Sequence, residues 1–383
     1  MTLHFSRNEF AGRIAQTTAA LAAAGLDGLL IFRQESMYYL TGYDTFGFVH
    51  FQCLYLAGDG TMTLLTRAPD LRQARHTSII MDIRIWTDRH GASPADDLKA
   101  LLDDRGCRGK RLGVELEAYG LTGAKWRMVE TAMEGFCALE DASTLINILR
   151  VVKSPAEINY IRRAAELGDA ALSEANRLAV AGAYEGDILA AMQGAVFAGG
   201  GDYPGNAFII GSGRDALLCR FFSGRRHLDA EDQLMIEFAG VYRHYHAALM
   251  RTIVVGEPSD RRRHMHDACA AALAACKGAL KPGRLMGEVF AAHARVFDDA
   301  GFGVHRLNAC GYSMGATFSP NWMDWPMFYA DNPVDIVPGM TFFLHMILMD
   351  SDHDLAMALG ESVLVGENGC ERLSAASLDL VVN

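Results

Sequence analysis

The sequence lacks the features that mark several special classes of protein. Its eight cysteines include no CxxC pair, so neither a disulfide framework nor a zinc site is expected. No apolar run reaches the length of a membrane span, and the opening "MTLHFSRNEFAGRIAQ" contains no apolar signal core. We therefore expect a cytoplasmic protein that has free thiols and no membrane partner.

Positive charge is also scarce. The 35 Lys and Arg residues are outnumbered by 46 Asp and Glu residues, which gives a net charge of −11. An acidic protein repels a polyanion, so nucleic acid is not an expected partner. The one basic cluster, "RRRH" at 261–264, is interpreted as a solvated helix end. With 383 residues, 50% of them hydrophobic, the chain can bury a sizeable core in two domains.

The first part of the chain alternates helices and strands. "SRNE" at 6–9 is a capping box and predicts a helix that ends near Gly25. Buried strands are predicted over 26–32 and 51–58, with a short helix and turn between them, and similar segments continue to about residue 145. This alternation predicts a smaller α/β domain over residues 1–149.

A domain boundary follows at "RVVKSPAEI", which spans 150–158. Ser154 is a helix N-cap, Pro155 occupies the first helical position, and Glu157 completes a capping box. We expect one larger catalytic domain over residues 150–383.

The larger domain contains an internal repeat. "GAYEGDILAAMQGAVFAGGG" begins at Gly182, and the similar "GRLMGEVFAAHARVFDDAGFG" begins at Gly283. Each copy follows a helix and precedes two predicted strands, which are 207–223 and 233–255 in the first copy and 304–318 and 340–365 in the second. Two such units predict a pseudo-symmetric α+β domain whose curved antiparallel sheet surrounds a shared cleft, with helices on its outer face.

Two glycine-rich motifs resemble known functional motifs, but the sequence after each of them argues against that function. "GYSMG" at 311–315 has the form of a nucleophile elbow around Ser313, but "ATFSPNWMDWP" follows it and has no helical period. "GSGRDA" at 211–216 follows a strand, yet no helix opens after it, which argues against a dinucleotide. We expect neither a serine hydrolase nor a bound cofactor.

Three stretches together resemble the pita-bread family, which includes prolidases, proline-specific aminopeptidases, methionine aminopeptidases and creatinase. They are "LRVVKSPAEI", the strand pair around 233–255, and "PGMTFF" with the later "ESVLVGENGCERL". The likeness covers nearly the whole chain. It implies the pita-bread fold, a small-molecule substrate, and a homodimer in which the N-terminal domain of one subunit helps to close the cleft of the other.

The metallopeptidases of this family hold two metal ions with two Asp, one His and two Glu side chains. The resemblance places Glu237 and Ala248 at the two Asp positions, Tyr312 at the His position, and His345 and Glu361 at the two Glu positions. Two carboxylates and one imidazole do not make up that ligand set. The resemblance therefore implies a metal-free site, and a single metal on Glu237, His345 and Glu361 is the weaker alternative.

The alternation of side chains along a strand adds one residue to this site. If position 248 faces the cleft, His246 faces it too, and we expect His246 to lie beside Glu237 on the neighbouring strand. Together with His345 and Glu361 this would make an acid–base site without a metal. The alternative for His246 is an ordinary half-buried histidine.

Within the family, this chain resembles creatinase at Ala248 and in the "AL-x-RT" pattern there. It more closely resembles the ectoine hydrolases, through "CRFFSGRR" at 219–226 and the "GYS" turn. That resemblance implies a small zwitterion with a carboxylate at one end and an amidinium at the other. Arg220 would bind the carboxylate, unless it forms a structural ion pair, and Glu237 or Glu361 would pair with the amidinium.

Aromatic residues are expected to wall this pocket. Phe221, Trp322 and Trp325 would contact the cationic face of the substrate, although packing alone also explains them.

The expected chemistry follows from these groups. Glu237 would attack the amidinium carbon or activate water, and His246 or His345 would protonate the departing nitrogen. Tyr312 would donate a hydrogen bond to the tetrahedral centre.

Three functions compete at this point. The first is a metal-independent hydrolase of a C–N bond in a small amidine or guanidine, with ectoine preferred. The second is a metal-dependent Xaa-Pro dipeptidase, which the replaced ligands oppose. The third is an inactive member that only binds a ligand, which the clustered polar groups oppose because apolar residues would pack there at lower cost.

Overall fold

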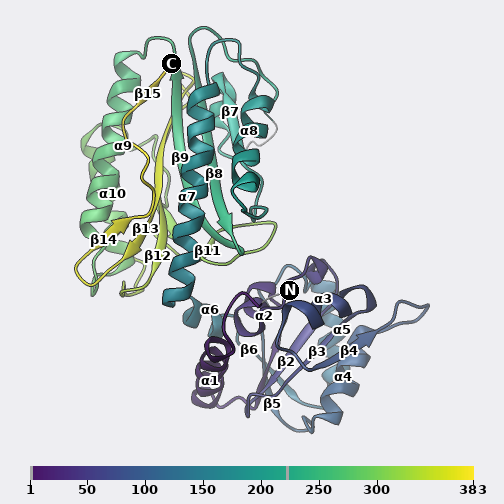
Figure 1. Cartoon of the computed structure of the whole chain (residues 1–383). Helices are drawn as coiled ribbons and strands as arrows, with labels where there is room; N and C mark the ends of the chain where they lie inside the picture. Colours follow the sequence, from purple (N-terminus) through teal and green to yellow (C-terminus); the bar gives the residue numbers. More distant parts are fainter. Residues whose placement is uncertain (1–2, 221–223) are drawn as a thin grey trace. The chain divides into compact units, whose positions relative to one another are not determined.

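The computed structural model describes residues 3–220 and 224–383. It divides into two compact units, Met1–Arg150 and Val151–Asn383, one residue after the predicted boundary. Figure 1 shows both units with most of their helices and strands labelled. None of the helices among the described residues is long and apolar enough to cross a membrane.

The N-terminal unit is built on a mixed sheet in the order β4-β3-β2-β1-β5-β6. The central strand β1 pairs antiparallel with β2 and parallel with β5, and apolar cores fill the space between the sheet and its helices. The α/β fold predicted for this part of the chain is confirmed. Its elements are α1 (Arg7–Ala23), β1 (Gly28–Ile31), α2 (Gln34–Thr41), η1 (Gly47–Val49), β2 (Cys53–Ala57), β3 (Met62–Arg67), η2 (Ala68–Asp70), α3 (Leu71–Thr77), β4 (Asp82–Trp86), α4 (Pro94–Asp104), β5 (Arg111–Val114), α5 (Gly123–Met133), β6 (Ala138–Asp141) and α6 (Leu145–Arg150).

The C-terminal unit is the curled antiparallel sheet of the pita-bread fold, in the order β11-β10-β12-β13-β9-β8-β7. Its two long hairpins, β8–β9 and β12–β13, join through antiparallel pairing of β9 with β13. The elements are α7 (Pro155–Leu178), α8 (Glu185–Ala198), β7 (Ile209–Ser212), η3 (Gly213–Leu217), β8 (Asp232–Tyr242), β9 (Tyr245–Val255), α9 (Asp260–Ala279), α10 (Met286–Asp299), β10 (Gly311–Ser313), β11 (Asp324–Met327), β12 (Thr341–Asp350), β13 (Leu355–Val365), β14 (Cys370–Arg372) and β15 (Val381–Val382).

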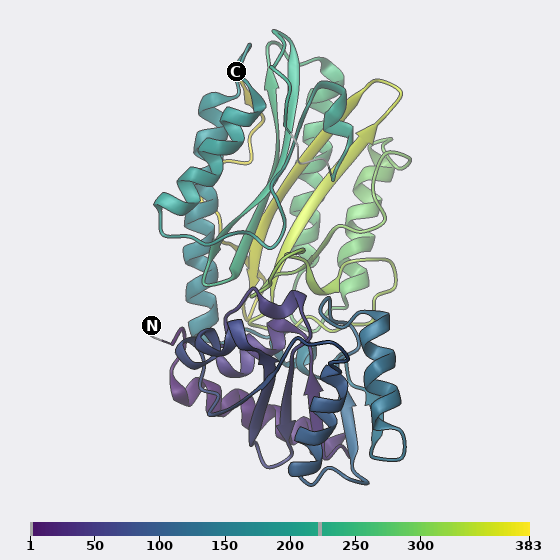
Figure 2. The same cartoon turned by 90° about the vertical axis from the view of Figure 1, so that its right-hand side faces the viewer.

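The predicted repeat is visible in this order of elements. Two helices, a short strand and a long hairpin occur twice, as α7-α8-β7-β8-β9 and as α9-α10-β10-β12-β13, with η3 after β7 and β11 after β10. Helix α7 packs on β8 and β9, and α9 packs on β12 and β13, so each hairpin has its own helical cover (Figures 1 and 2). The strands predicted over 207–223 and 304–318 are much shorter than expected. The first ends at Ser212 because Gly213, with φ of 55°, turns the chain into η3.

The start of α7 shows how a local sequence signal also fixes tertiary structure. Ser154 Oγ accepts the N–H of Glu157 at 3.3 Å, and Glu157 Oε2 accepts the N–H of Ser154 at 2.9 Å. The other carboxylate oxygen, Oε1, accepts the hydroxyl of Tyr245 at 2.8 Å and so ties the first turn of α7 to β9.

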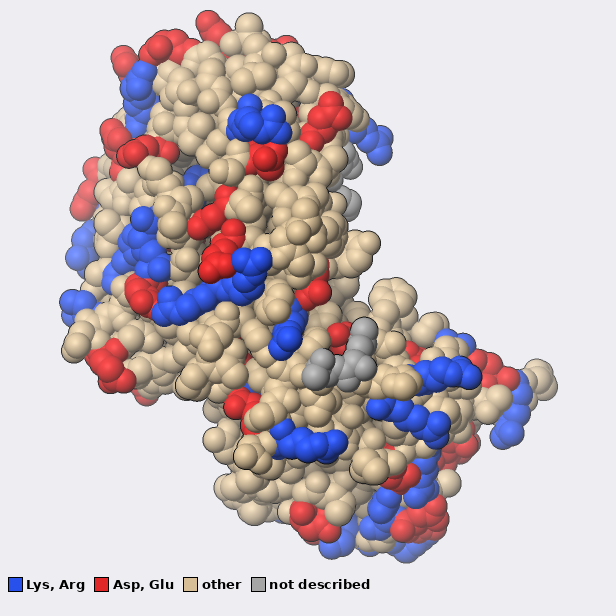
Figure 3. All heavy atoms as spheres, viewed as in Figure 1, with Lys and Arg blue, Asp and Glu red and all other residues tan. Residues whose placement is uncertain are grey.

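Charged side chains of both signs are interspersed on the surface. Figure 3 shows Lys and Arg side chains beside Asp and Glu side chains over the face that it draws. The basic cluster at 261–264 lies in the first turns of α9, where Arg261 pairs with the buried carboxylate of Asp350 and Arg263 pairs with Glu257. The cluster is therefore largely neutralised within the chain.

A buried ion cluster lies under the sheet, on the face that α9 covers. The carboxylate of Glu361 in β13 is fully buried and accepts Lys277 Nζ at 2.8 Å and Arg372 Nε at 2.7 Å. Arg251 in β9 donates to the carbonyl oxygens of Met250 at 2.8 Å and Gly360 at 2.7 Å. These contacts tie β9, β13, β14 and α9 together.

This cluster predicts a stability effect. Glu361→Ala should lower the free energy of unfolding by about 3 kcal/mol, because it leaves two cations without their anion. The loss lies at the lower end of the range for a buried pair, since the side chains of Lys277 and Arg372 are 21% and 36% exposed. Urea denaturation measures the change. The control Glu367→Ala alters an exposed carboxylate and should shift stability by less than about 0.5 kcal/mol. Equal effects of the two variants would contradict this account.

Candidate active site

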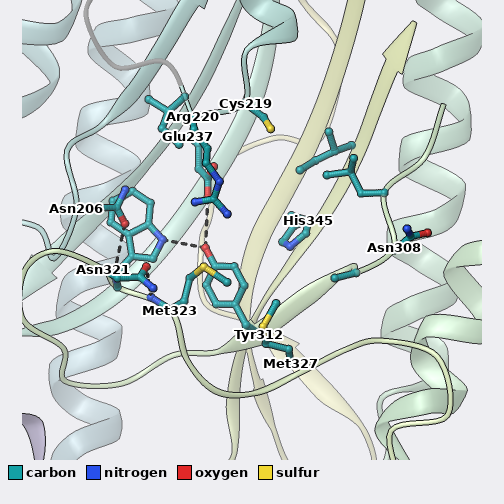
Figure 4. Close-up of a pocket in the computed structure, with 15 residues that line it drawn as sticks. Asn206, Cys219, Arg220, Glu237, Asn308, Tyr312, Asn321, Met323, Met327 and His345 are labelled. Carbon is teal, nitrogen blue, oxygen red and sulfur yellow. Dashed lines mark hydrogen bonds between the residues drawn. The ribbon is translucent and has the colours of Figure 1, made fainter. Parts of the chain in front are cut away.

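A cavity of about 330 Å³ opens on the other face of the sheet, and strands of both repeats line it together with loop segments (Figure 4). From β7, β8, β10, β11 and β12 come Ile209, Glu237, Tyr312, Met327, His345 and Ile347. From the connecting segments come Asn206, Cys219, Arg220, Leu307, Asn308, Ala309, Asn321, Trp322 and Met323. The cavity is thus mainly apolar, with a few polar groups that converge on it, which is typical of a small-molecule site.

Three side chains in the cavity form a chain of hydrogen bonds. The indole Nε1–H of Trp322 donates to the hydroxyl of Tyr312 at 2.8 Å, and that hydroxyl donates to Glu237 Oε1 at 3.2 Å (Figure 4). Trp322 and Tyr312 are 1% and 3% exposed, so this chain lies in a largely desolvated environment. The one proton of the Tyr312 hydroxyl is therefore committed to Glu237 when the carboxylate is ionised.

The environment of Glu237 alters its acidity. Burial raises its pKa to about 7, and the hydrogen bond from Tyr312 and the positive charge of Arg220 offset part of that effect. Both the neutral and the ionised form of Glu237 are consequently accessible near neutral pH. Burial and the neighbouring Glu237 carboxylate raise the pKa of Tyr312 well above its usual value, so its phenol stays protonated.

Arg220 and His345 are brought into the same cavity. Arg220 is exposed at its wall, and Figure 4 shows its side chain extending toward Glu237 and Tyr312. His345 packs its ring against the rings of Tyr312 and Phe343, at centroid distances of 5.7 and 5.6 Å. Burial lowers the pKa of His345 to about 4, so the imidazole is neutral at pH 7. Within the described part of the chain, its Nδ1 has no hydrogen-bond partner.

The structure places His246 elsewhere than the sequence predicted. It does face the same side of the sheet as position 248, but its cross-strand partner is Val241, whereas Glu237 pairs with Met250. Four residues along a strand separate the two sites by about 13 Å. Both ring nitrogens of His246 are hydrogen-bonded within the protein, and burial lowers its pKa to about 3. The prediction that His246 lies beside Glu237 is wrong. The alternation of side chains gives the face of a strand to which a residue points, but not the position of the residue along the strand.

Glu361 also lies outside the cavity. Residues paired directly across two strands share a face, and the cavity residue His345 pairs with Gly360, not with Glu361. A shift of one residue puts a side chain on the opposite face, where Glu361 binds Lys277 and Arg372. The last ligand position that faces the cavity is therefore Gly360, where a Cβ atom would lie 2.8 Å from the ring of Phe343.

The remaining predicted residues divide in the same way. Trp322 lines the cavity, whereas Trp325 in β11 is 36% exposed and does not line it. Phe221 lies outside the described residues. Ser313 belongs to β10, is fully buried, and accepts a hydrogen bond from Lys153 Nζ at 3.2 Å, so "GYSMG" is a strand segment and not an elbow.

Sequence patterns missed the three cavity asparagines, Asn206, Asn308 and Asn321. All three belong to connecting segments, where periodicity gives no signal, and only the "PGN" turn marks the position of Asn206. Asn206 Oδ1 accepts the N–H of Trp322 at 3.4 Å, which links two of these segments.

The donor set of the cavity does not fit a pair of metal ions. The positions that the resemblance matches to metal ligands hold Glu237, Ala248, Tyr312 and His345, and Gly360 takes the place opposite His345 that was expected for Glu361. Among the residues that the structure describes, no three His, Cys, Asp or Glu side chains converge as a metal site requires. One carboxylate and one imidazole leave most of the coordination sites of two cations unfilled.

Comparison with known proteins places the chain in a family. Residues 159–367 match metallopeptidase family M24, and residues 13–152 match the creatinase/prolidase N-terminal domain. The chain is 28% identical to the ectoine hydrolase of Halomonas elongata over 394 residues, which cover 98% of this chain and 97% of that protein. It is 24% identical over 271 residues to an Xaa-Pro dipeptidase of Pyrococcus furiosus, covering 69% and 76% of the two chains.

Solved structures agree on the fold. A prolidase from Thermococcus sibiricus superposes with a TM-score of 0.88 at 18% identity, over 98% of this chain and 99% of that one. An Xaa-Pro dipeptidase from Bacillus anthracis gives a TM-score of 0.85 at 18% identity, over 98% and 100%. The chain therefore belongs to metallopeptidase family M24 and carries the creatinase/prolidase N-terminal domain in front of its pita-bread domain.

Proposed function

We propose that this protein hydrolyses a C–N bond of a small zwitterionic amidine without a metal ion, and that ectoine is the preferred substrate. The observation that carries the proposal is the position of Glu237, the one carboxylate that lines the cavity among the described residues, next to Arg220 and Tyr312. The similarity to an ectoine hydrolase over nearly the whole of both chains supports the choice of substrate.

The charges of the cavity suit such a zwitterion. Arg220 can bind a carboxylate in a bidentate pair, and Glu237 can pair with an amidinium. A cation beside Glu237 stabilises its ionised form, so substrate binding lowers the pKa of Glu237 and prepares it as a base. A cavity of about 330 Å³ admits a compact solute, and Ile347, Leu307 and Met327 give it an apolar wall for the carbon skeleton.

A carboxyl group with a pKa of about 7 can both accept and return a proton at neutral pH. Glu237 removes a proton from water while the water oxygen bonds to the amidinium carbon, which becomes tetrahedral. The Glu237 proton then passes to one amidine nitrogen, the bond between that nitrogen and the carbon breaks, and the hydroxyl proton of the tetrahedral centre ends on the released amine. The products are an amide and an ammonium group. Direct attack by Glu237, followed by water, would give the same products.

Tyr312 and His345 take roles that differ from those expected of the sequence. Tyr312 donates its proton to Glu237, so we assign it to orienting the carboxylate and stabilising its ionised form. His345 is neutral at pH 7, so it does not carry the extra proton that a general acid would donate. It can instead accept a hydrogen bond from an amidine N–H or relay a proton.

A metal-dependent dipeptidase is the less suitable function. Its chemistry requires several anionic oxygens around the cations, and alanine and glycine occupy two of the five positions that would supply ligands.

Replacement of the proposed base tests the function directly. Glu237→Gln keeps the shape of the side chain but cannot accept a proton, so kcat for ectoine should fall by about 1,000-fold. Proton NMR can follow the amide product. The matched control Glu361→Gln makes the same change on the opposite face of the sheet, and kcat should be unchanged at temperatures where the variant is folded. Undiminished turnover by Glu237→Gln would refute the assignment, and tight binding without turnover in the unaltered protein would indicate a ligand-binding member.

The acidity of Glu237 predicts the pH dependence. Protonation removes the base, so kcat/KM for ectoine should fall tenfold per pH unit below about pH 7, the pKa in the free enzyme. The bound cation lowers that pKa, so the corresponding limb of kcat should lie at lower pH. Tyr312→Phe removes a hydrogen bond that favours the carboxylate, and the limb of kcat/KM should move to higher pH. Steady-state rates between pH 5 and 9 measure all three, and a flat profile through pH 7 would contradict the assignment.

A further inference from the structure

One buried histidine outside the cavity is hydrogen-bonded in a way that leaves no ring nitrogen free. His246 is fully buried, its Nδ1–H donates to the carbonyl oxygen of His244 at 2.8 Å, and Thr317 Oγ1 lies 3.2 Å from the same nitrogen. Its Nε2 accepts the backbone N–H of Gly205 at 2.8 Å. This pattern fixes one neutral tautomer, with a donor at one end of a rigid ring and an acceptor at the other.

The acceptor end of His246 holds the segment between α8 and β7. A side chain at Gly205 would lie 2.9 Å from the carbonyl oxygen of Asn321 and 3.0 Å from the backbone nitrogen of Trp322, so the two segments pack backbone against backbone. The next residue, Asn206, accepts the N–H of Trp322 and lines the cavity. Position 205 therefore sets how closely Asn206 and Trp322 approach each other.

Trp322 continues the series of contacts to the carboxylate. Its ring lies 6.3 Å from the ring of His246, and its indole N–H holds the hydroxyl of Tyr312, which donates to Glu237. Each link is a hydrogen bond or a close packing contact. A substitution at His246 can therefore shift the position of Glu237 although none of the residues between them is substituted.

We propose that His246 is a positioning residue for Glu237. Its Nε2 fixes the backbone of Gly205, and Gly205 in turn fixes the positions of Asn206 and Trp322. Trp322 then holds the hydroxyl of Tyr312 against the carboxylate of Glu237. The catalytic consequence rests on the proposed function, whereas the structural coupling does not. The proposal depends on the acceptor at Nε2 and not on the bond from Nδ1 to His244, because only the acceptor contacts the segment that carries Asn206.

Two variants separate the ends of the ring. In His246→Gln the side-chain oxygen reaches the place of Nε2 and can still accept the N–H of Gly205. In His246→Asn the amide nitrogen reaches the place of Nδ1 and can still donate to His244, but the acceptor is lost. We expect His246→Gln to keep most of kcat/KM for ectoine and His246→Asn to lose about 100-fold, mainly in kcat, as for a misplacement of about 1 Å at the reacting group. Equal losses in the two variants would mean that the ring only stabilises the β8–β9 turn, and would overturn the proposal.

A second measurement needs no substrate. With Trp86, Trp126 and Trp325 replaced by Phe, the remaining fluorescence comes from Trp322, which should respond to protonation of Glu237 through Tyr312 with a midpoint near pH 7. The other titratable residues that line the cavity are Cys219, Arg220, Tyr312 and His345, and Glu237→Gln in the same background should abolish the transition and so identify it. His246→Asn should raise the midpoint, because a weaker bond from Tyr312 stabilises the carboxylate less, and His246→Gln should leave it unchanged.

The two measurements distinguish the proposals from each other. A raised midpoint in His246→Asn, with no turnover of ectoine by the unaltered protein or by either variant, would support the positioning role and refute the proposed function. An unchanged midpoint in His246→Asn would refute the positioning role whatever the turnover.

Discussion

The interaction on which the site depends is the hydrogen bond from the Tyr312 hydroxyl to Glu237 in a desolvated cavity. Burial alone favours the neutral acid, whereas this bond and the charge of Arg220 favour the anion, and the balance leaves the pKa near 7. The indole of Trp322 occupies the other side of the same hydroxyl and fixes its direction. An aromatic pair thus orients the one carboxylate that lines the cavity among the described residues. The chemistry proposed for the protein follows from that arrangement.

One face of the sheet of the C-terminal unit carries contacts that stabilise the fold, and the other face carries the groups of the candidate active site. On the face covered by α9, Glu361 is fully paired with two cations and ties neighbouring elements together. On the cavity face, the position beside it is a glycine, and the polar groups of His345 and Glu237 are left with incomplete hydrogen bonding or raised pKa values. Because alternate residues of β13 point to opposite faces, the same strand serves both purposes. Incomplete pairing is costly to bury, and at His345 it lies in the cavity, where a ligand can complete it.

Much of the fold could be predicted from the sequence, because its signals are local. The capping box at Ser154, the repeated helix pattern and the long hairpins around 233–255 and 340–365 all have a fixed period or a defined end. The site was predicted less completely. Glu237, Tyr312 and His345 followed from matching strand positions, but Glu361 was misplaced by one residue, which reverses its face, and His246 was misplaced along its strand. The cavity asparagines could not be found, since loop residues are positioned by contacts such as that of Gly205 with His246, which no local pattern encodes.

We propose that side chains alone carry out the proton transfers in this cavity. The most direct measurement is turnover of ectoine by protein that has been exhaustively chelated, with its metal content determined by elemental analysis of the same sample. Full turnover at a metal content far below one ion per chain is the predicted result. Loss of turnover on chelation, restored by manganese or cobalt, would contradict the claim and return the protein to the metal-dependent peptidases.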